Sequence, residues 1–116
     1  MPSLIVQKYG GTSLADAERV RAVADHVART RRQGHQVVVV VSAMGRTTDD
    51  LIRLANEVSR VVPPRELDML VTTGERVSMA LLCMALAELS VPAASFTGSQ
   101  AGIITDTVHG NAKILE

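Results

Sequence analysis

A glycine pair flanked by a lysine and two hydroxyl residues follows the first apolar run of the chain. The apolar residues 4–6 are typical of a short buried strand, which leads into Lys8-Tyr9-Gly10-Gly11-Thr12-Ser13. Glycines let the backbone turn without Cβ clashes, so successive N–H groups can point at one anion, and the lysine supplies a mobile cation. The segment therefore predicts a phosphate-binding loop, with a simple tight turn as the alternative. It is not a Walker P-loop, because Lys8 precedes the glycines.

A second polar loop follows the next apolar run. Residues 37–41 are all valine, which is typical of a parallel strand covered on both faces. Residues 42–47 come at the carboxyl end of that strand, which is the edge where open α/β sheets bind their ligands. Ser42 and Thr47 are candidate ligand contacts there. Thr47 could equally cap a second helix together with Asp50, and both roles can hold.

Between the two strands, the apolar periodicity predicts an amphipathic helix over about residues 15–32. Ser13 and Asp16 resemble a capping box, which places the glycine pair at the helix N-terminus, where an anion is stabilised. Gly34 is expected to end the helix. The predicted unit is therefore strand, helix, parallel strand, and it belongs to the α/β class.

A glycine and an acid interrupt the longest apolar segment. The pair Pro63-Pro64 breaks the second helix, and a further helix over about residues 65–89 is interrupted by Thr72-Thr73-Gly74-Glu75. A glycine inside a helix costs about 1 kcal/mol relative to alanine, and a buried acid needs a partner. Glu75 could pair with an arginine such as Arg76 or Arg53, or it could receive a substrate ammonium group. Residues 93–96 and 102–107 are expected to form further strand segments.

The composition limits the class of function. The 116 residues suit one domain, and 12 basic and 12 acidic residues cancel, which argues against nucleic acid or an anionic membrane as a partner. Cys83 lies in an apolar stretch and is expected to fill the core. No stretch has about 18 consecutive apolar residues, and no leader pattern is present, so a cytoplasmic location is expected. The histidines His26, His35 and His109 lack the spacing of a metal site.

Four segments, taken in order and spacing, closely resemble the aspartate kinases of the amino acid kinase family. They are residues 6–13 (VQKYGGTS), 40–49 (VVSAMGRTTD), 73–76 (TGER) and 96–102 (FTGSQAG). The resemblance implies a three-layer α/β/α sandwich with a mainly parallel sheet. Residues 1–116 would be the incomplete N-terminal half of the kinase domain, with no regulatory ACT domain.

The resemblance also implies a reaction and roles for individual residues. The reaction is phosphoryl transfer from ATP, with Mg²⁺ carried by the nucleotide, to the side-chain carboxylate of L-aspartate. The carried-over roles are as follows: Lys8 is catalytic; Lys8, Tyr9, Gly10, Gly11 and Ser13 bind phosphate; Ser42, Gly45, Thr47 and Glu75 bind aspartate; and no residue holds a metal.

The expected partners and the alternatives complete these predictions. We expect a homo-oligomer or docking to a full-length kinase chain, and no activity of the 116 residues alone. One alternative is a kinase for another carboxylate, such as glutamate or N-acetylglutamate. The other is a non-catalytic module that docks onto a full-length kinase.

Overall fold

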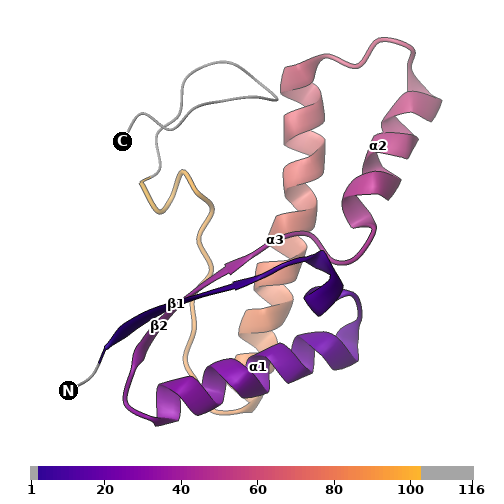
Figure 1. Cartoon of the computed structure of the whole chain (residues 1–116). Helices are drawn as coiled ribbons and strands as arrows, with labels where there is room; N and C mark the ends of the chain where they lie inside the picture. The colour runs from indigo at the N-terminus through magenta and orange to yellow at the C-terminus, as the bar shows by residue number, and fades with distance from the viewer. Residues whose placement is uncertain (1–2, 103–116) are drawn as a thin grey trace.

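Two parallel strands joined by a helix form the centre of the molecule. The computed structural model describes residues 3–102 (Figure 1). Strand β1 (Leu4–Tyr9) pairs with β2 (Gln36–Val41), and the register places Leu4 opposite Gln36 and Tyr9 opposite Val41. Helix α1 (Ala17–Arg32) connects them. The predicted strand-helix-strand unit is therefore confirmed.

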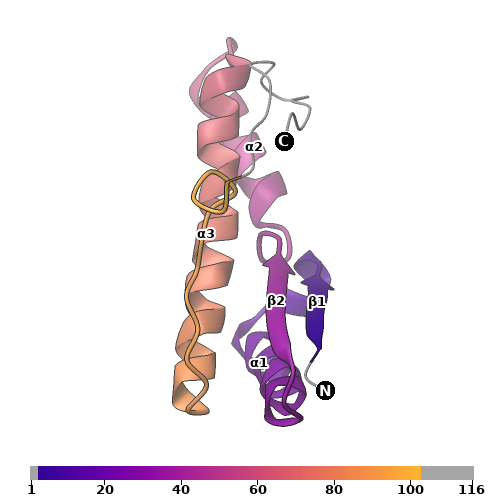
Figure 2. The ribbon, with the colours of Figure 1, turned by 90° about the vertical axis from the view of Figure 1, so that its left-hand side faces the viewer.

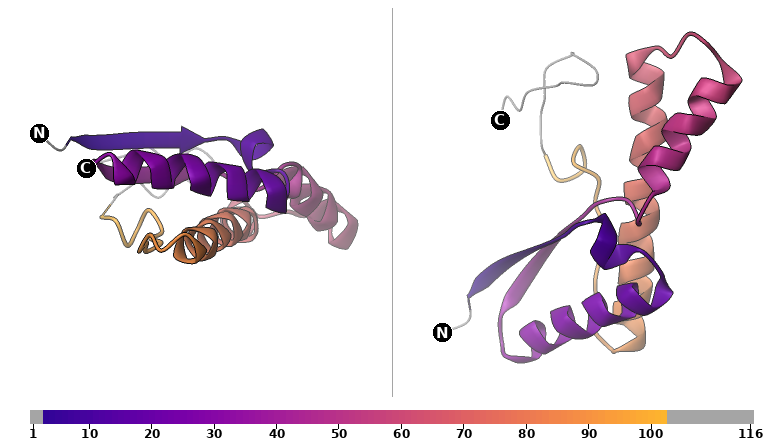
Figure 3. Two further views of the ribbon diagram at one scale, coloured as in Figure 1. Left: turned by 90° about the horizontal axis from the view of Figure 1, so that it is seen from below. Right: turned by 45° about the vertical axis from the view of Figure 1, so that its right-hand side comes forward.

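The hydrophobic core lies on one face of this sheet. Figures 2 and 3 show α1 and α3 (Pro64–Glu88) on the same side of the two strands. The core side chains from α1, α3 and the segments that flank them are Leu14, Val20, Val23, Ala24, Val27, Ala28, Leu82, Leu86 and Val91. Tyr9, Val37, Val39 and Val41 of the strands pack against them. Alternation along the strands thus directs every second side chain into the core.

The opposite face of the sheet is open within residues 3–102, which corrects the expectation that β2 is covered on both faces. Leu4 and Val6 are 65% and 64% exposed, and Val38 and Val40 are 48% and 46% exposed. A continuous run of valines predicts a strand with both faces buried. The burial of the second face, however, depends on other elements that pack against the sheet. The α/β class with a parallel sheet is confirmed, with its described helices on one face.

Helix α1 begins later than predicted. Residues Gly11–Leu14 form a short 3-10 helix, η1, and the N-cap of α1 is Asp16, whose Oδ1 accepts the Arg19 backbone N–H at 2.8 Å. The prediction of Ser13 as the cap was wrong, because the η1 turn occupies the residues that a longer α1 would need. Gly34, with a φ of +93°, follows the C-cap of α1 as expected.

Helices α2 (Thr47–Val58) and α3 form a hairpin. Helix α2 and the first half of α3 project beyond the carboxyl ends of the strands, and the second half of α3 lies beside α1 (Figure 1). The N-cap of α2 is Arg46, without a side-chain hydrogen bond, so the predicted capping by Thr47 and Asp50 was wrong. Thr47 is instead the first helical residue, and Asp50 lies in the first turn, where a carboxylate still favours the helix dipole. The expected interruption of α3 at residues 72–75 was wrong: the helix runs through Gly74, which is buried against Ala43 and Thr47.

The predicted third strand is absent. Residues 93–96 have no regular structure, because a strand needs a paired neighbour and none is offered to them within residues 3–102. They are followed by a turn in which Thr97 and Gln100 exchange backbone-to-side-chain hydrogen bonds of 2.9 and 3.3 Å, the pattern of a capping box. The expected strand over residues 102–107 lies outside the described residues from position 103 onward.

One described helix, α3, is long and apolar enough to cross a membrane by length and composition alone. Core helices pass the same test, and Leu82 and Leu86 of α3 are buried in the hydrophobic core. The absence of a membrane partner therefore stays a prediction.

Candidate functional site

The two polar loops predicted to bind ligands meet at the carboxyl edge of the sheet. The Gly45 backbone N–H donates to the Gly11 carbonyl at 2.9 Å. A Cβ atom on Gly11 would lie 3.0 Å from the Ala43 carbonyl oxygen and 3.2 Å from that of Gly45. The glycine at position 11 is thus required for the close approach of the loops. The parallel strands bring the loops together because both strands end at the same edge.

The carbonyl groups of the first loop are held by hydrogen bonds. The Gly10 carbonyl accepts the Ser13 N–H at 3.1 Å, and the Thr12 carbonyl accepts Nη1 of Arg19 at 2.7 Å. Within residues 3–102, the N–H groups of Gly10, Gly11 and Thr12 donate no hydrogen bond. Neighbouring backbone N–H groups left free in a tight turn can bind an anion. This geometry supports the predicted phosphate-binding loop.

Lys8 and Tyr9 point to opposite faces of β1. Lys8 is exposed on the open face of the sheet, opposite Val40, and makes no ion pair with any described residue. Tyr9 faces the core side, where its phenol O–H donates to Oε1 of Gln7 at 2.9 Å and burial raises its pKa above the usual 10.0. The Lys8 ammonium is therefore free for a ligand, whereas the Tyr9 side chain has a structural role.

The second loop has a turn that requires glycine and two polar side chains. Gly45 has a φ of +48°, a conformation that residues with a Cβ rarely adopt. Ser42 is half-buried, and its Oγ donates a long hydrogen bond of 3.4 Å to the Ala43 carbonyl. Thr47 is half-buried at the start of α2. The candidate aspartate-binding residues Ser42, Gly45 and Thr47 thus all lie between the end of β2 and the first residue of α2.

Helix α3 joins this site through Gly74. A Cβ atom on Gly74 would lie 2.9 Å from the Ala43 Cβ and 3.2 Å from Cγ2 of Thr47. The glycine therefore lets α3 touch the second loop, and this contact brings the neighbouring Glu75 to the same end of the sheet. Sequence patterns identified Gly74 as costly in a helix, but not the contact that requires it.

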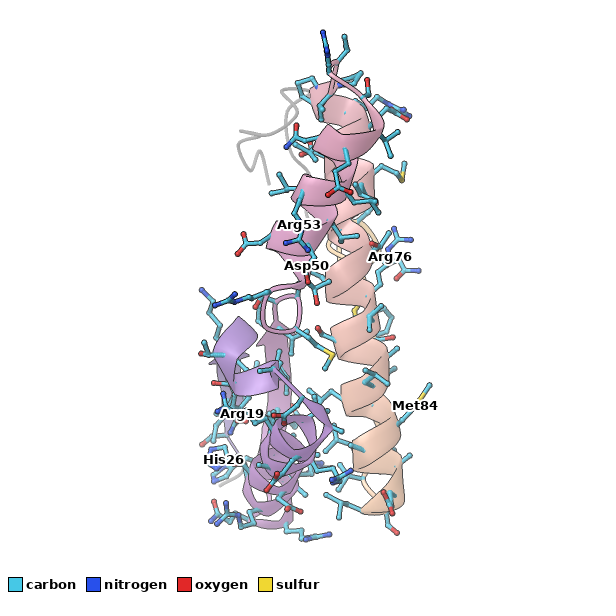
Figure 4. All side chains as sticks on the ribbon, turned by 90° about the vertical axis from the view of Figure 1, so that its right-hand side faces the viewer. Arg19, His26, Asp50, Arg53, Arg76 and Met84 are labelled. Atoms are coloured by element: carbon cyan, nitrogen blue, oxygen red, sulfur yellow. The ribbon has the colours of Figure 1, made fainter. Side chains whose placement is uncertain are left out.

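Glu75 is exposed and has no ion pair with any residue in the described range. Arg53 pairs instead with Asp50 at 3.0 Å on α2, and Arg76 lies on the far side of α3 from that pair (Figure 4). The alternative role of Glu75 as the partner of Arg53 or Arg76 was therefore wrong. Its carboxylate remains available for a cationic ligand group.

The candidate site holds no obvious metal cage. Residues 3–102 contain no group of three or more histidine, cysteine, aspartate or glutamate side chains that could hold a metal ion. His26 instead packs edge-on against the Tyr9 ring at 6.4 Å between centroids.

The fold and the two loops agree with a known family. The model of the amino acid kinase family matches residues 3–116. The chain belongs to the amino acid kinase family.

Individual relatives are aspartokinases. The chain is 62% identical to the aspartokinase of Mycobacterium tuberculosis (strain H37Rv) and 56% identical to that of Corynebacterium glutamicum, each over 98% of this chain. The crystal structure of aspartate kinase from Synechocystis matches 84% of this chain with a TM-score of 0.80 and 55% identity. The predicted resemblance to aspartate kinases is thereby confirmed. The chain spans 27% of the length of the two curated relatives and 17% of the Synechocystis chain.

Proposed function

We propose that this chain supplies the phosphate-binding and aspartate-binding part of an aspartate kinase. The proposed reaction transfers the γ-phosphoryl group of ATP to the side-chain carboxylate of L-aspartate and gives 4-aspartyl phosphate, at the entry to lysine, threonine and methionine synthesis. The observation that carries the proposal is the hydrogen bond of 2.9 Å between Gly45 and Gly11. It joins a loop with free N–H groups to the loop that borders the candidate aspartate site.

The reaction needs two anions to be held in line. A carboxylate oxygen forms the new bond to phosphorus while the bond between phosphorus and the ADP oxygen breaks, so no proton has to move. Such transfer depends mostly on positioning and on screening of negative charge. The Lys8 ammonium and the free N–H groups of Gly10, Gly11 and Thr12 are suited to the phosphoryl oxygens. Bound with the nucleotide, Mg²⁺ would supply further screening.

The aspartate substrate would be recognised by the second loop and α3. Glu75 carries a free carboxylate that can accept hydrogen bonds from the ammonium group of aspartate. The hydroxyl groups of Ser42 and Thr47 can donate hydrogen bonds to the carboxylate groups of the substrate. The Gly74 contact holds α3, which carries Glu75, against the second loop. In this arrangement Glu75 binds the positive end of the substrate, away from the reacting carboxylate.

A fusion enzyme tests the proposal directly. The 116 residues would replace the matching 27% of the Mycobacterium tuberculosis relative, and aspartyl hydroxamate formation would be measured with ATP, aspartate and hydroxylamine. We expect activity from the fusion and none from the 116 residues alone. A fusion that phosphorylates glutamate or N-acetylglutamate instead of aspartate would overturn the substrate. Activity of a full-length kinase that changes only on mixing with the separate chain would favour the docking module.

A further inference from the structure

We propose that Arg19 is a positioning residue that holds the phosphate-binding loop in its anion-accepting conformation. The proposal rests on the proposed function, because it concerns how the Gly10–Ser13 turn presents its N–H groups. Arg19 lies on α1, outside the two loops, and its Nη1 donates to the Thr12 carbonyl at 2.7 Å. Figure 4 shows Arg19 near the start of that helix. No pattern in the sequence distinguishes it from the other arginines of α1.

The effect of this hydrogen bond follows from the planar peptide group. In a trans peptide the carbonyl of one residue and the N–H of the next point in opposite directions, so holding one orients the other. The bond from Arg19 to the Thr12 carbonyl therefore orients the Ser13 N–H, which in turn donates to the Gly10 carbonyl at 3.1 Å. That second bond orients the Gly11 N–H, one of the free donors.

A separate hydrogen bond from the other loop orients the second free donor. The Gly11 carbonyl accepts the Gly45 N–H at 2.9 Å, which orients the Thr12 N–H, the next free donor. Without Arg19, the peptide between Thr12 and Ser13 could rotate and break the turn. The Thr12 carbonyl would then turn toward the Gly10 carbonyl, and the Gly10–Gly11 peptide would lose the hydrogen bond that orients the Gly11 N–H.

Arg19 is itself held in place by the helix start. Its backbone N–H donates to Oδ1 of Asp16, the N-cap of α1, at 2.8 Å. The side chain is anchored to a helical backbone position, and it makes no ion pair with a described residue that would compete for its guanidinium. The first turn of α1 and the phosphate-binding loop thus form one hydrogen-bonded unit.

The test compares Arg19→Met with Arg21→Met in the 116-residue chain. Arg21 is an exposed arginine of the same helix whose side chain makes no hydrogen bond with a described residue, so both variants lose the same charge. Inorganic phosphate would be titrated while the backbone amide signals of Gly11 and Thr12 are followed by NMR. Amide hydrogen exchange of Ser13 would be measured without ligand, and thermal unfolding would report the global stability.

For Arg19→Met we expect phosphate binding to weaken about tenfold and Ser13 exchange to accelerate about tenfold, as for loss of a hydrogen bond to a charged group. For Arg21→Met both values should stay within about twofold of the parent chain, with a similar unfolding temperature in the two variants. Equal phosphate binding and equal Ser13 exchange in the two variants would overturn the role of Arg19.

Failure of the proposed function gives a different result. If the parent chain binds no phosphate, the phosphate-binding role fails, while the Ser13 exchange rates still decide whether Arg19 holds the loop. Arg19→Ala replaces Arg19→Met if the latter does not fold. Unfolding of both variants would show that Arg19 supports the whole fold, which would overturn a local positioning role.

Discussion

Gly74 of α3 lies so close to Ala43 of the β2–α2 loop that a Cβ atom at position 74 would be 2.9 Å from the Ala43 Cβ. Cβ atoms do not approach each other so closely, so the two elements can touch only because residue 74 is glycine. The contact fixes how far Glu75 stands from the loop. It also explains why α3 tolerates a residue with poor helix propensity near its middle.

Gly74→Ala is expected to lower the free energy of unfolding by about 1–2 kcal/mol, because the cost of overpacking exceeds the gain in helix propensity. Urea denaturation would measure it. The control places the same substitution in an Ala43→Gly background, where the clashing Cβ is gone and the loss should be smaller. An equal loss in both backgrounds would contradict the contact.

Gly11→Ala is expected to cost about 1–3 kcal/mol, because its Cβ would press against the carbonyl oxygens of Ala43 and Gly45. Gly10→Ala is the matched control, since a Cβ atom at position 10 would meet nothing within 4 Å. That substitution should change stability by less than about 0.5 kcal/mol. Thermal unfolding of the two variants would compare them, and a larger loss for Gly10→Ala would be contrary to the loop contact.

Lys8→Ala, made in the fusion enzyme, should reduce kcat by about 10²–10³-fold, the usual effect of removing one charge-stabilising group. The Michaelis constant for aspartate should change far less, because Lys8 is expected to contact the transferred phosphoryl group. Steady-state kinetics with varied aspartate would separate the two effects. An unchanged kcat would refute the catalytic role of Lys8.

Glu75→Gln in the same fusion should raise the Michaelis constant for aspartate about tenfold, as for loss of a hydrogen bond to a charged group, with kcat little changed. Glu88→Gln is the control, because Glu88 is an exposed acid on the same helix, without an ion pair to any described residue. If the two variants have the same Michaelis constant, Glu75 does not bind the substrate ammonium.

Cys83 is expected to react slowly with iodoacetamide in the folded chain. Burial raises the pKa of its thiol above the usual 9.0, and the thiolate is the reactive form. The raised pKa also means that the stability linked to this group is present below pH 9 and is lost as the pH rises through the folded pKa. Alkylation rates across pH would show a midpoint higher in the folded chain than in urea. Since Cys83 is the single cysteine, the labelling reports one site, and coinciding midpoints would argue against the shift.

Local patterns were sufficient for the strand-helix-strand unit and for the two loops. The valine run at 37–41 favours a strand, and Gly34 favours the end of a helix. Both are local backbone preferences that do not depend on distant parts of the chain. Because both strands are parallel, their loops must lie at one edge, and the contact of Gly11 with Gly45 follows that geometry. The family also followed from the order of short motifs.

Boundaries and long-range contacts depended on the tertiary structure. The N-cap of α1 is Asp16 instead of Ser13 because η1 competes for the same residues, and residues 93–96 did not become a strand because pairing needs a neighbour. Amino-acid types determined which groups can bind phosphate, since charge and the absence of a Cβ are properties of single residues. Tertiary structure alone decided that Arg19 holds the loop and that Gly74 admits α3, because both are contacts across space between separate elements.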